Sequence, residues 1–249
     1  RNYVFSATAF GSNVNGSEEA LIQTQRSAVH FFQRADAEHL ELDSTRTSLN
    51  GYGGSLNFGK QGGRFNFMSF LSMNSPGLEL NDIGFLNSTD EIVHIFWMGY
   101  SFNEPFSIFR SARINFNMFN AWDFGGTHQA AGGNINAHSE FLNLWEARFF
   151  VNYEADVISN SALRGGPSFI TPGGMTGHLS VETSSRKKLS FEVDGFLNVG
   201  REDSKEMIGL DFEINYKPIS NLNISLTPEY SIRRSLLQYV SQEEFVNEN

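Results

Sequence analysis

The stretch GLDFEINYK, residues 209–217, alternates strictly between apolar and polar side chains. Because side chains of an extended strand alternate with a period of two, all of its apolar residues share one face. They are Leu210, Phe212, Ile214 and Tyr216. A soluble sandwich turns such a face toward a protein core, whereas a membrane barrel turns it toward lipid. The environment behind Phe212 therefore decides the fold class.

The same alternation recurs along the chain and predicts an all-β protein with about eleven strands. One helix is predicted, within Glu18–Arg34, where good helix formers form one apolar side. The strands are predicted at residues 2–10, 48–60, 64–74, 91–101, 110–122, 131–142, 145–156, 175–185, 188–199, 207–217 and 221–231.

Strand length and loop order favour a membrane barrel over a sandwich. Predicted strands of roughly 9–13 residues match a tilted crossing of a bilayer and exceed the usual soluble length. Tight turns such as 60–64 and 218–221 alternate with longer connections, and an antiparallel up-and-down barrel has this order. The long loops are predicted near residues 11–47, 75–90, 123–133 and 157–174.

The composition agrees with a transmembrane β-barrel. The mean hydropathy of −0.30 is too polar for a bundle of membrane helices, and no apolar run reaches the length of a spanning helix. A net charge of −10 with scattered Lys and Arg excludes a nucleic-acid surface. The absence of cysteine excludes disulfides and thiol catalysis.

Aromatic residues near the predicted strand ends suit the interfacial girdles of a barrel, although aromatics also have high strand propensity. They include Trp97, Trp122, Trp145 and Tyr216. An odd strand number does not close a bacterial barrel, so we expect residues 1–249 to be one segment of a larger, even-stranded barrel domain. Because the chain begins at Arg1 without a signal region, we expect it to be a mature or excised segment.

Several long motifs resemble one family of bacterial outer-membrane proteins. They are NGSEEALIQTQRS (15–27), FQRADAEHLELDSTRTSLNGYGG (32–54), NSPGLELNDIGFL (74–86), YSFNEPFSIFRS (100–111), WDFGGTHQAAGGNIN (122–136) and ALRGGPSFITPGG (162–174). In this order they closely resemble the C-terminal barrel of the Bacteroidota family named domain of unknown function 5916. The resemblance implies an outer-membrane barrel, usually preceded by a family 9 carbohydrate-binding module. It implies no catalytic residues.

The loops contain candidate ligands of weak specificity. Glu79, Asp82 and Asp90 could supply oxygen ligands to calcium, but they have no EF-hand spacing. A cluster of His30, Asp36 and His39, with Glu38 and Glu41 nearby, fits no standard metal signature, and a solvated loop is the favoured interpretation. The DFGG motif at 123–126 lacks the other kinase motifs and is interpreted as a turn. No cofactor and no catalytic residue is predicted.

The loop at 157–174 is predicted to fold inward, because Arg164 is followed by Gly165 and Gly166, which permit close backbone approach. Arg164 is then either a ligand contact or an ionic partner, across the lumen, of the strand carboxylates Asp194, Asp211 and Glu213. The structural interpretation is favoured.

Three functions remain open from the sequence. The leading one is an outer-membrane barrel for nutrient or carbohydrate handling or transport, with membrane lipid as its main partner. The alternative is a plugged barrel that anchors a carbohydrate-binding module or other outer-membrane proteins. A surface glycan hydrolase is the least favoured, since it needs two carboxylates about 5–9.5 Å apart and no pair stands out.

Overall fold

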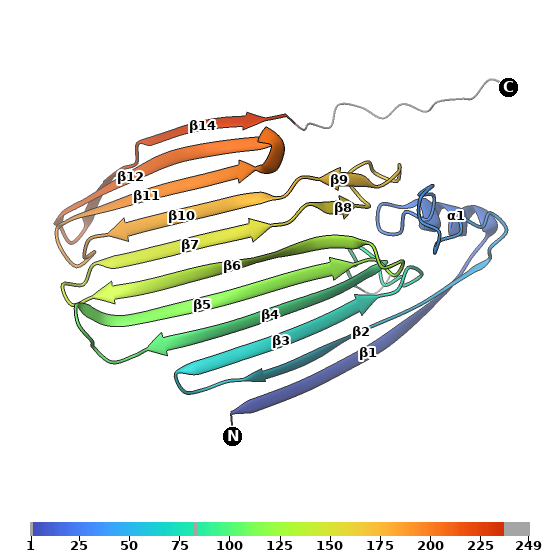
Figure 1. The fold of residues 1–249 in the computed structure, drawn as a ribbon, viewed down its shortest axis with the longest axis horizontal. Coiled ribbons are helices and arrows are strands. Elements are labelled where there is room, and N and C mark those ends of the chain that lie inside the picture. Colours follow the sequence, from blue (N-terminus) through green and yellow to red (C-terminus); the bar gives the residue numbers. More distant parts are fainter. Residues whose placement is uncertain (1, 82–83, 237–249) are drawn as a thin grey trace.

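The computed structural model describes residues 2–81 and 84–236 as a single large antiparallel sheet with loops gathered at one end (Figure 1). Strands that follow one another in the chain are neighbours in the sheet, with two exceptions: β8 and β9 form a separate hairpin between β7 and β10, and β14 pairs with β12. The strands are β1 (Tyr3–Asn15), β2 (Ser48–Lys60), β3 (Phe65–Asn74), β4 (Glu91–Phe102), β5 (Phe109–Trp122), β6 (His128–Phe141), β7 (Glu146–Glu154), β8 (Val157–Ser159), β9 (Phe169–Thr171), β10 (Gly174–Glu182), β11 (Leu189–Gly200), β12 (Lys205–Ile219), β13 (Leu222–Leu226) and β14 (Glu229–Ser235).

The predicted all-β, antiparallel up-and-down arrangement is confirmed, and a strand lies at each predicted position. The last predicted strand, 221–231, is divided into β13 and β14, and both pair with β12. Pro228 lies between them and cannot donate to a ladder, which explains the interruption. Among the described residues, β1 pairs only with β2, so the sheet is open along that edge.

The helix predicted within Glu18–Arg34 is confirmed, whereas one of the predicted loops differs in extent. Helix α1 covers only Glu18–Arg26, with Ser17 as its N-cap, and a short 3-10 turn, η1 (Arg201–Asp203), joins β11 to β12. The connection predicted at 123–133 is a short link of residues 123–127, because β6 already begins at His128. Long and short connections therefore alternate less regularly than predicted. Among the described residues, no helix is long and apolar enough to cross a membrane.

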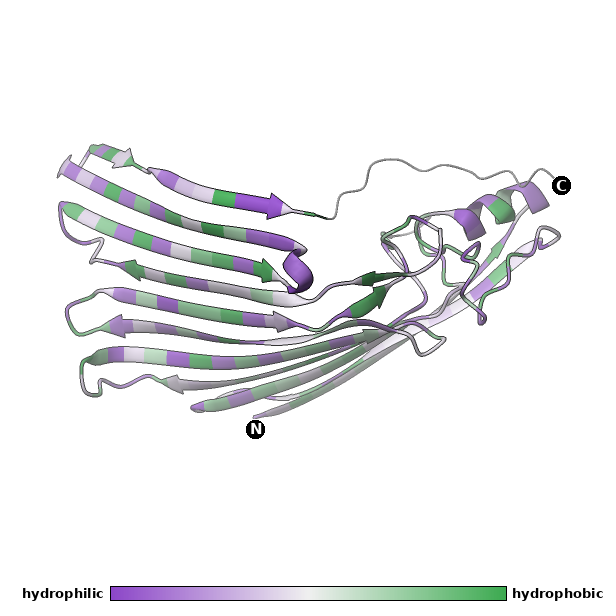
Figure 2. Cartoon of the chain, turned by 45° about the horizontal axis from the view of Figure 1, so that its top comes forward, coloured by the Kyte–Doolittle hydropathy of each residue, from purple (hydrophilic) through white to green (hydrophobic). Residues whose placement is uncertain are grey.

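The strand register gives the sheet one apolar face from β1 to β14, which we call the apolar face. Hydrophobic and hydrophilic residues alternate along the strands (Figure 2). The strand register places the apolar side chains of neighbouring strands side by side, as with Phe212 opposite Val193. Its exposed members include Phe5, Leu56, Phe58, Met98, Ile114, Met118, Ile135, Phe149, Leu179, Val193, Leu210 and Phe212. His94 is a polar exception, and it is hydrogen-bonded to Ser69 on the same face.

Almost no apolar core supports this sheet within the described residues. The buried hydrophobic cluster consists of Leu21, Phe32 and Leu49, with Leu42 packed against it. It lies among the loops, where α1 packs on the end of β2. Phe212 and Leu179, in contrast, are 43% and 55% exposed. Nothing in the described chain covers the apolar face.

The loops gather on the opposite face of the sheet, which we call the polar face. Strands β1 and β2 continue beyond the end of β3, and the polar face of this extension carries Ser12, Leu49 and Gly51. The Ser12 hydroxyl accepts a hydrogen bond from the Glu79 backbone N–H at 2.9 Å. A Cβ at Gly51 would lie 2.1 Å from the backbone nitrogen of Leu78, so only glycine allows this contact.

Candidate functional site

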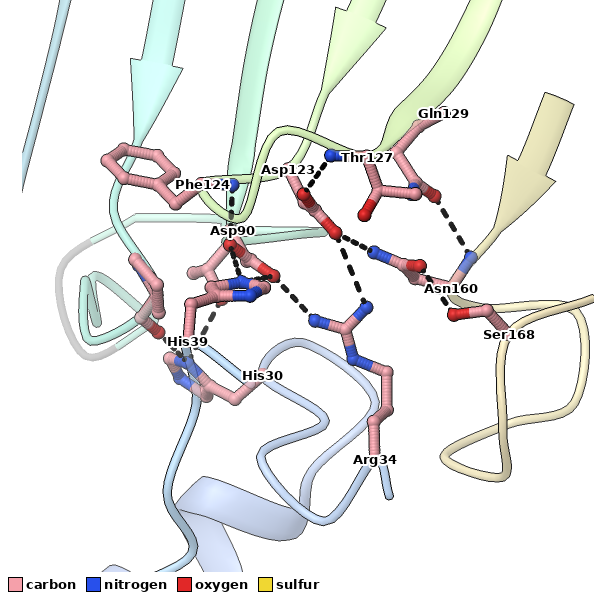
Figure 3. A network of polar contacts seen from close by, with 12 residues as sticks. His30, Arg34, His39, Asp90, Asp123, Phe124, Thr127, Gln129, Asn160 and Ser168 are labelled. Atoms are coloured by element: carbon pink, nitrogen blue, oxygen red, sulfur yellow. Dashed lines mark hydrogen bonds and ion pairs between the residues drawn. The ribbon is translucent and has the colours of Figure 1, made fainter. Parts of the chain in front are cut away.

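A buried ionic network joins the loops into a unit, which we call the loop cap: α1 and residues 27–47, 75–81, 84–90, 123–127 and 155–173 (Figure 3). Arg34 is its centre, with Nη2 2.6 Å from Asp90 Oδ2 and Nη1 4.0 Å from Asp123 Oδ2. All three side chains are at least 95% buried. Each comes from a different connection, so this network can form only when the three loops meet.

Further hydrogen bonds hold both carboxylates in place. Asp90 accepts from the Phe124 backbone N–H at 3.0 Å, and Asp123 accepts from the Thr127 backbone N–H at 2.7 Å. Asn160 donates to Asp123 at 2.9 Å and so connects the segment between β8 and β9 to the network. The interpretation of DFGG as a turn agrees with the Thr127 bond, but Asp123 also has an ionic role that the motif did not reveal.

The two histidines of the first loop are part of the cap. His39 Nε2 lies 2.9 Å from both carboxylate oxygens of Asp90. His30 is buried, with Nε2 3.0 Å from Glu79 Oε2 and Nδ1 2.8 Å from the carbonyl oxygen of Pro76. The interpretation of this segment as a solvated loop is therefore wrong for His30, which is buried, whereas His39 is paired with Asp90 but remains exposed. Because the loop folds onto the sheet, His30 is desolvated, and both histidines are paired with carboxylates.

The carboxylates proposed for calcium are engaged with protein groups. Asp90 pairs with Arg34 and His39, Glu79 pairs with His30, and Asp82 lies outside the described residues. His39, Asp90 and Asp123 do place one potential ligand atom each within 4.8 Å of one another. Since Arg34 already supplies positive charge to both aspartates, a metal ion at this position would compete with its guanidinium.

Two cavities flank Arg34. The first has a volume of about 350 Å³ and is bounded by residues 28–31, 87–91 and 159–161 together with Arg34 and Gln129. The second, of about 640 Å³, is bounded by residues 36–39 and by Asp123, Ser168 and Ile170. The ionic network is thus the wall between two small-molecule-sized spaces.

The loop that carries Arg164 lies against the first long loop. A Cβ at Gly165 would lie 2.3 Å from Gln33 Nε2, and Gly166 follows in the same tight turn. The carboxylates suggested as partners of Arg164 have neighbours on the sheet: Asp194 lies 3.1 Å from His178 Nε2, and Glu213 accepts from Asn215. The loop therefore packs within the cap, and Asp194 and Glu213 bond to other residues of the polar face.

An acidic band crosses the polar face near the short-turn end of the strands. The register places five glutamates side by side on five consecutive strands of the sheet: Glu140, Glu146, Glu182, Glu192 and Glu213. Arg148 forms ion pairs with three of them, at 3.3, 3.5 and 3.4 Å from Glu146, Glu182 and Glu192. Asp194 and Asp211 face each other in the adjacent row. Carboxylates exceed cations here, so the band is negative.

An asparagine ladder occupies the polar face of β5 and β6. Asn115 donates to Asn136 and Asn117 donates to Asn134, both at 2.7 Å. Trp97 adds its indole N–H to Asn115 at 3.2 Å. Neutral amides therefore line one part of the polar face, whereas charged groups line the part formed by β7, β10, β11 and β12.

Two carboxylates of the cap have lowered pKa values. A hydrogen bond from the Ser168 backbone N–H, 2.8 Å long, holds the pKa of Asp36 below its ordinary value. Burial acts to raise the pKa of Glu79, but hydrogen bonds from the Asn81 backbone N–H and from His30 together outweigh it, and the net shift is downward.

The cap is therefore expected to loosen in acid. A carboxylate whose pKa is lower in the folded state stabilises that state above its ordinary pKa, here 3.8 for Asp36 and 4.5 for Glu79. This stabilisation is lost as the pH falls through the folded-state values. We expect protease cleavage within residues 28–39 and 75–81 to accelerate below about pH 4. Asp36→Asn and Glu79→Gln should remove this pH dependence, and its persistence in the double variant would contradict the assignment.

The model of one protein family, described as Domain of unknown function (DUF5916), matches residues 3–248. No curated protein and no solved structure matches the chain significantly.

Proposed function

The chain belongs to this family of domains of unknown function, and we propose that it forms part of a β-barrel in a bacterial outer membrane that handles or transports small polar nutrients. In this proposal the apolar face contacts lipid and the polar face lines an aqueous interior. Carbohydrates are the proposed nutrient class, by resemblance to relatives with a carbohydrate-binding module.

The observation that carries the proposal is the uncovered apolar face. Burying a side chain such as Phe, Leu or Ile typically contributes about 1.5–3 kcal/mol, and this sheet leaves more than ten of them partly exposed. In water such a surface would drive association. In a bilayer it is the required surface, and strands of 12–15 residues such as β4, β5, β6 and β12 are long enough to cross when tilted.

A closed barrel also accounts for the open edge of β1. Unpaired backbone groups in lipid cost several kcal/mol each, so a membrane sheet must continue until it closes. Folding of the full-length protein into lipid vesicles tests the proposal. Folded barrels migrate faster than heated samples in gels, and the absence of both insertion and this heat-modifiable mobility would refute it.

The alternative, a plugged barrel that anchors a partner, is favoured by one feature. The loop cap packs on the polar face, so in a closed barrel it would lie at the mouth of the interior. Conductance distinguishes the two functions, because a steady open pore excludes the plug.

The acidic band predicts cation selectivity for an open pore. Fixed negative charges raise the local cation concentration, and neutralising them should weaken this preference. We expect Glu182→Gln with Glu192→Gln to shift the reversal potential in a salt gradient toward zero. Glu104→Gln, at an exposed turn, is the control and should leave it unchanged. Equal reversal potentials for all three proteins would show that the band does not line the pore.

A further inference from the structure

We propose that the 350 Å³ cavity beside Arg34 binds a neutral polyhydroxylated molecule of the size of a mono- or disaccharide. This inference deepens the proposed function by naming a ligand class for the loop cap. It rests on the proposed function in one respect, namely that the ligand reaches the cavity through the barrel. The cavity lies at the lower end of the range of about 300–1,000 Å³ that is typical of small-molecule sites.

Hydrogen-bonding side chains dominate the wall of the cavity. Asn87, Ser88, Thr89 and Gln129 line one part, and Ser159, Asn160 and Ser161 line another. Amides and hydroxyls both donate and accept, as sugar hydroxyls do. Phe31 also lines the cavity, and an aromatic side chain is of the kind that packs against the C–H face of a sugar ring.

Two wall residues have buried donors without a partner. Arg34 Nε and Gln129 Nε2 have no hydrogen-bond acceptor among the described residues. Both side chains are otherwise fixed, since Arg34 pairs with Asp90 and Gln129 Oε1 accepts from the Asn160 backbone N–H at 2.9 Å. A buried donor without an acceptor costs free energy, so a ligand oxygen that reaches these groups is stabilising.

The charge of the wall selects against anions. The positive charge of Arg34 is already balanced by Asp90 at 2.6 Å, with Asp123 nearby. Glu91 also lines the cavity, and its side chain accepts a hydrogen bond from a neutral donor, the Ser88 hydroxyl, at 2.8 Å. The remaining charge is negative, so an anionic ligand would be repelled whereas a neutral one would not.

The backbone around the cavity is held in an unusual conformation. Phe31 and Asp90 both line it and both have positive φ angles, of 48° and 56°. Such conformations are unfavourable for residues other than glycine and are concentrated at functional sites. Two such residues therefore belong to the wall of this one cavity.

Saturation-transfer NMR on the folded full-length protein in detergent tests the proposal with glucose, galactose, N-acetylglucosamine and maltose as probes. Glucuronate, which differs from glucose by a carboxylate, is the matched anionic probe. We expect saturable binding of at least one neutral sugar and weaker binding of glucuronate. Absence of saturable binding by all four neutral probes, or tighter binding of glucuronate than of glucose, would overturn the proposal.

The variant Gln129→Glu tests whether the sugar binds in this cavity. The variant keeps the oxygen that accepts from Asn160 but replaces the unpartnered donor by an acceptor, so we expect about tenfold weaker sugar binding. Gln61→Glu, in the tight turn between β2 and β3, is the control and should bind as the parent protein does. Equal affinity in both variants would place the sugar elsewhere. A failure of the proposed barrel would instead appear as loss of vesicle insertion with sugar binding intact.

Discussion

Leu179→Arg is expected to abolish assembly of the protein into the outer membrane, whereas His178→Arg is expected to assemble normally. Leu179 lies on the apolar face in β10 and is 55% exposed. An arginine facing the middle of a bilayer costs about 2–4 kcal/mol, which is a large part of the stability of a folded protein. In water the same substitution at an exposed site would change stability little.

His178→Arg is a closely matched control. It introduces the same residue at the adjacent position of the same strand, but on the polar face. There Asp194 lies 3.1 Å from the present imidazole and can pair with the new guanidinium. Heat-modifiable mobility and the free energy of unfolding in vesicles measure both variants. If the two fold equally well, the apolar face does not contact lipid and the barrel proposal fails.

Asp90→Asn is expected to destabilise the loop cap by about 3 kcal/mol, since removing one partner of a buried ion pair leaves the other charge uncompensated. Asparagine tolerates the positive φ of this position and retains most of the volume, so the backbone need not change. Asp123, at 4.0 Å from Arg34, limits the loss. Hydrogen exchange should accelerate in residues 28–39 and 123–127, while the strands β4 and β5 remain protected.

The control for this variant is an exposed ion pair. Arg64 and Glu104 lie 3.2 Å apart with side chains 54% and 81% exposed, and Glu104→Gln should change stability by less than about 1 kcal/mol. In the Asp90→Asn background, Arg34→Met should recover part of the lost stability, because it removes the stranded charge. If Asp90→Asn and Glu104→Gln have equal effects, the network does not hold the cap together.

Both variants bear on function as well as on stability. Leu179→Arg tests whether lipid or water covers the apolar face, and Asp90→Asn tests whether the loops form one unit. A protein with an intact sheet and an open cap would separate the transport proposal from the sugar-binding proposal, since only the latter requires the cavity wall. Sugar binding should therefore be lost in Asp90→Asn even where the sheet still folds.

The strands and their faces were predictable from sequence because they are local properties. In GLDFEINYK the alternation itself assigns Phe212 to one face and Glu213 to the other, and the sheet register agrees. The helix predicted within Glu18–Arg34 is confirmed over Glu18–Arg26, while residues 27–34 contain helix formers but turn back to bury Phe32 and Arg34. Tertiary burial overrode local propensity there.

The loop cap and the acidic band required the tertiary structure. Arg34 meets Asp90 across 56 positions of sequence, and no local spacing encodes that approach. No glutamate of the acidic band can be recognised from its local sequence, because the band exists only through the strand register that aligns the five residues. The sequence by itself therefore determined which residues face each side of the sheet, because side-chain alternation repeats within every strand. Tertiary structure alone decided which charges meet, because those contacts depend on how separate loops and strands approach in space.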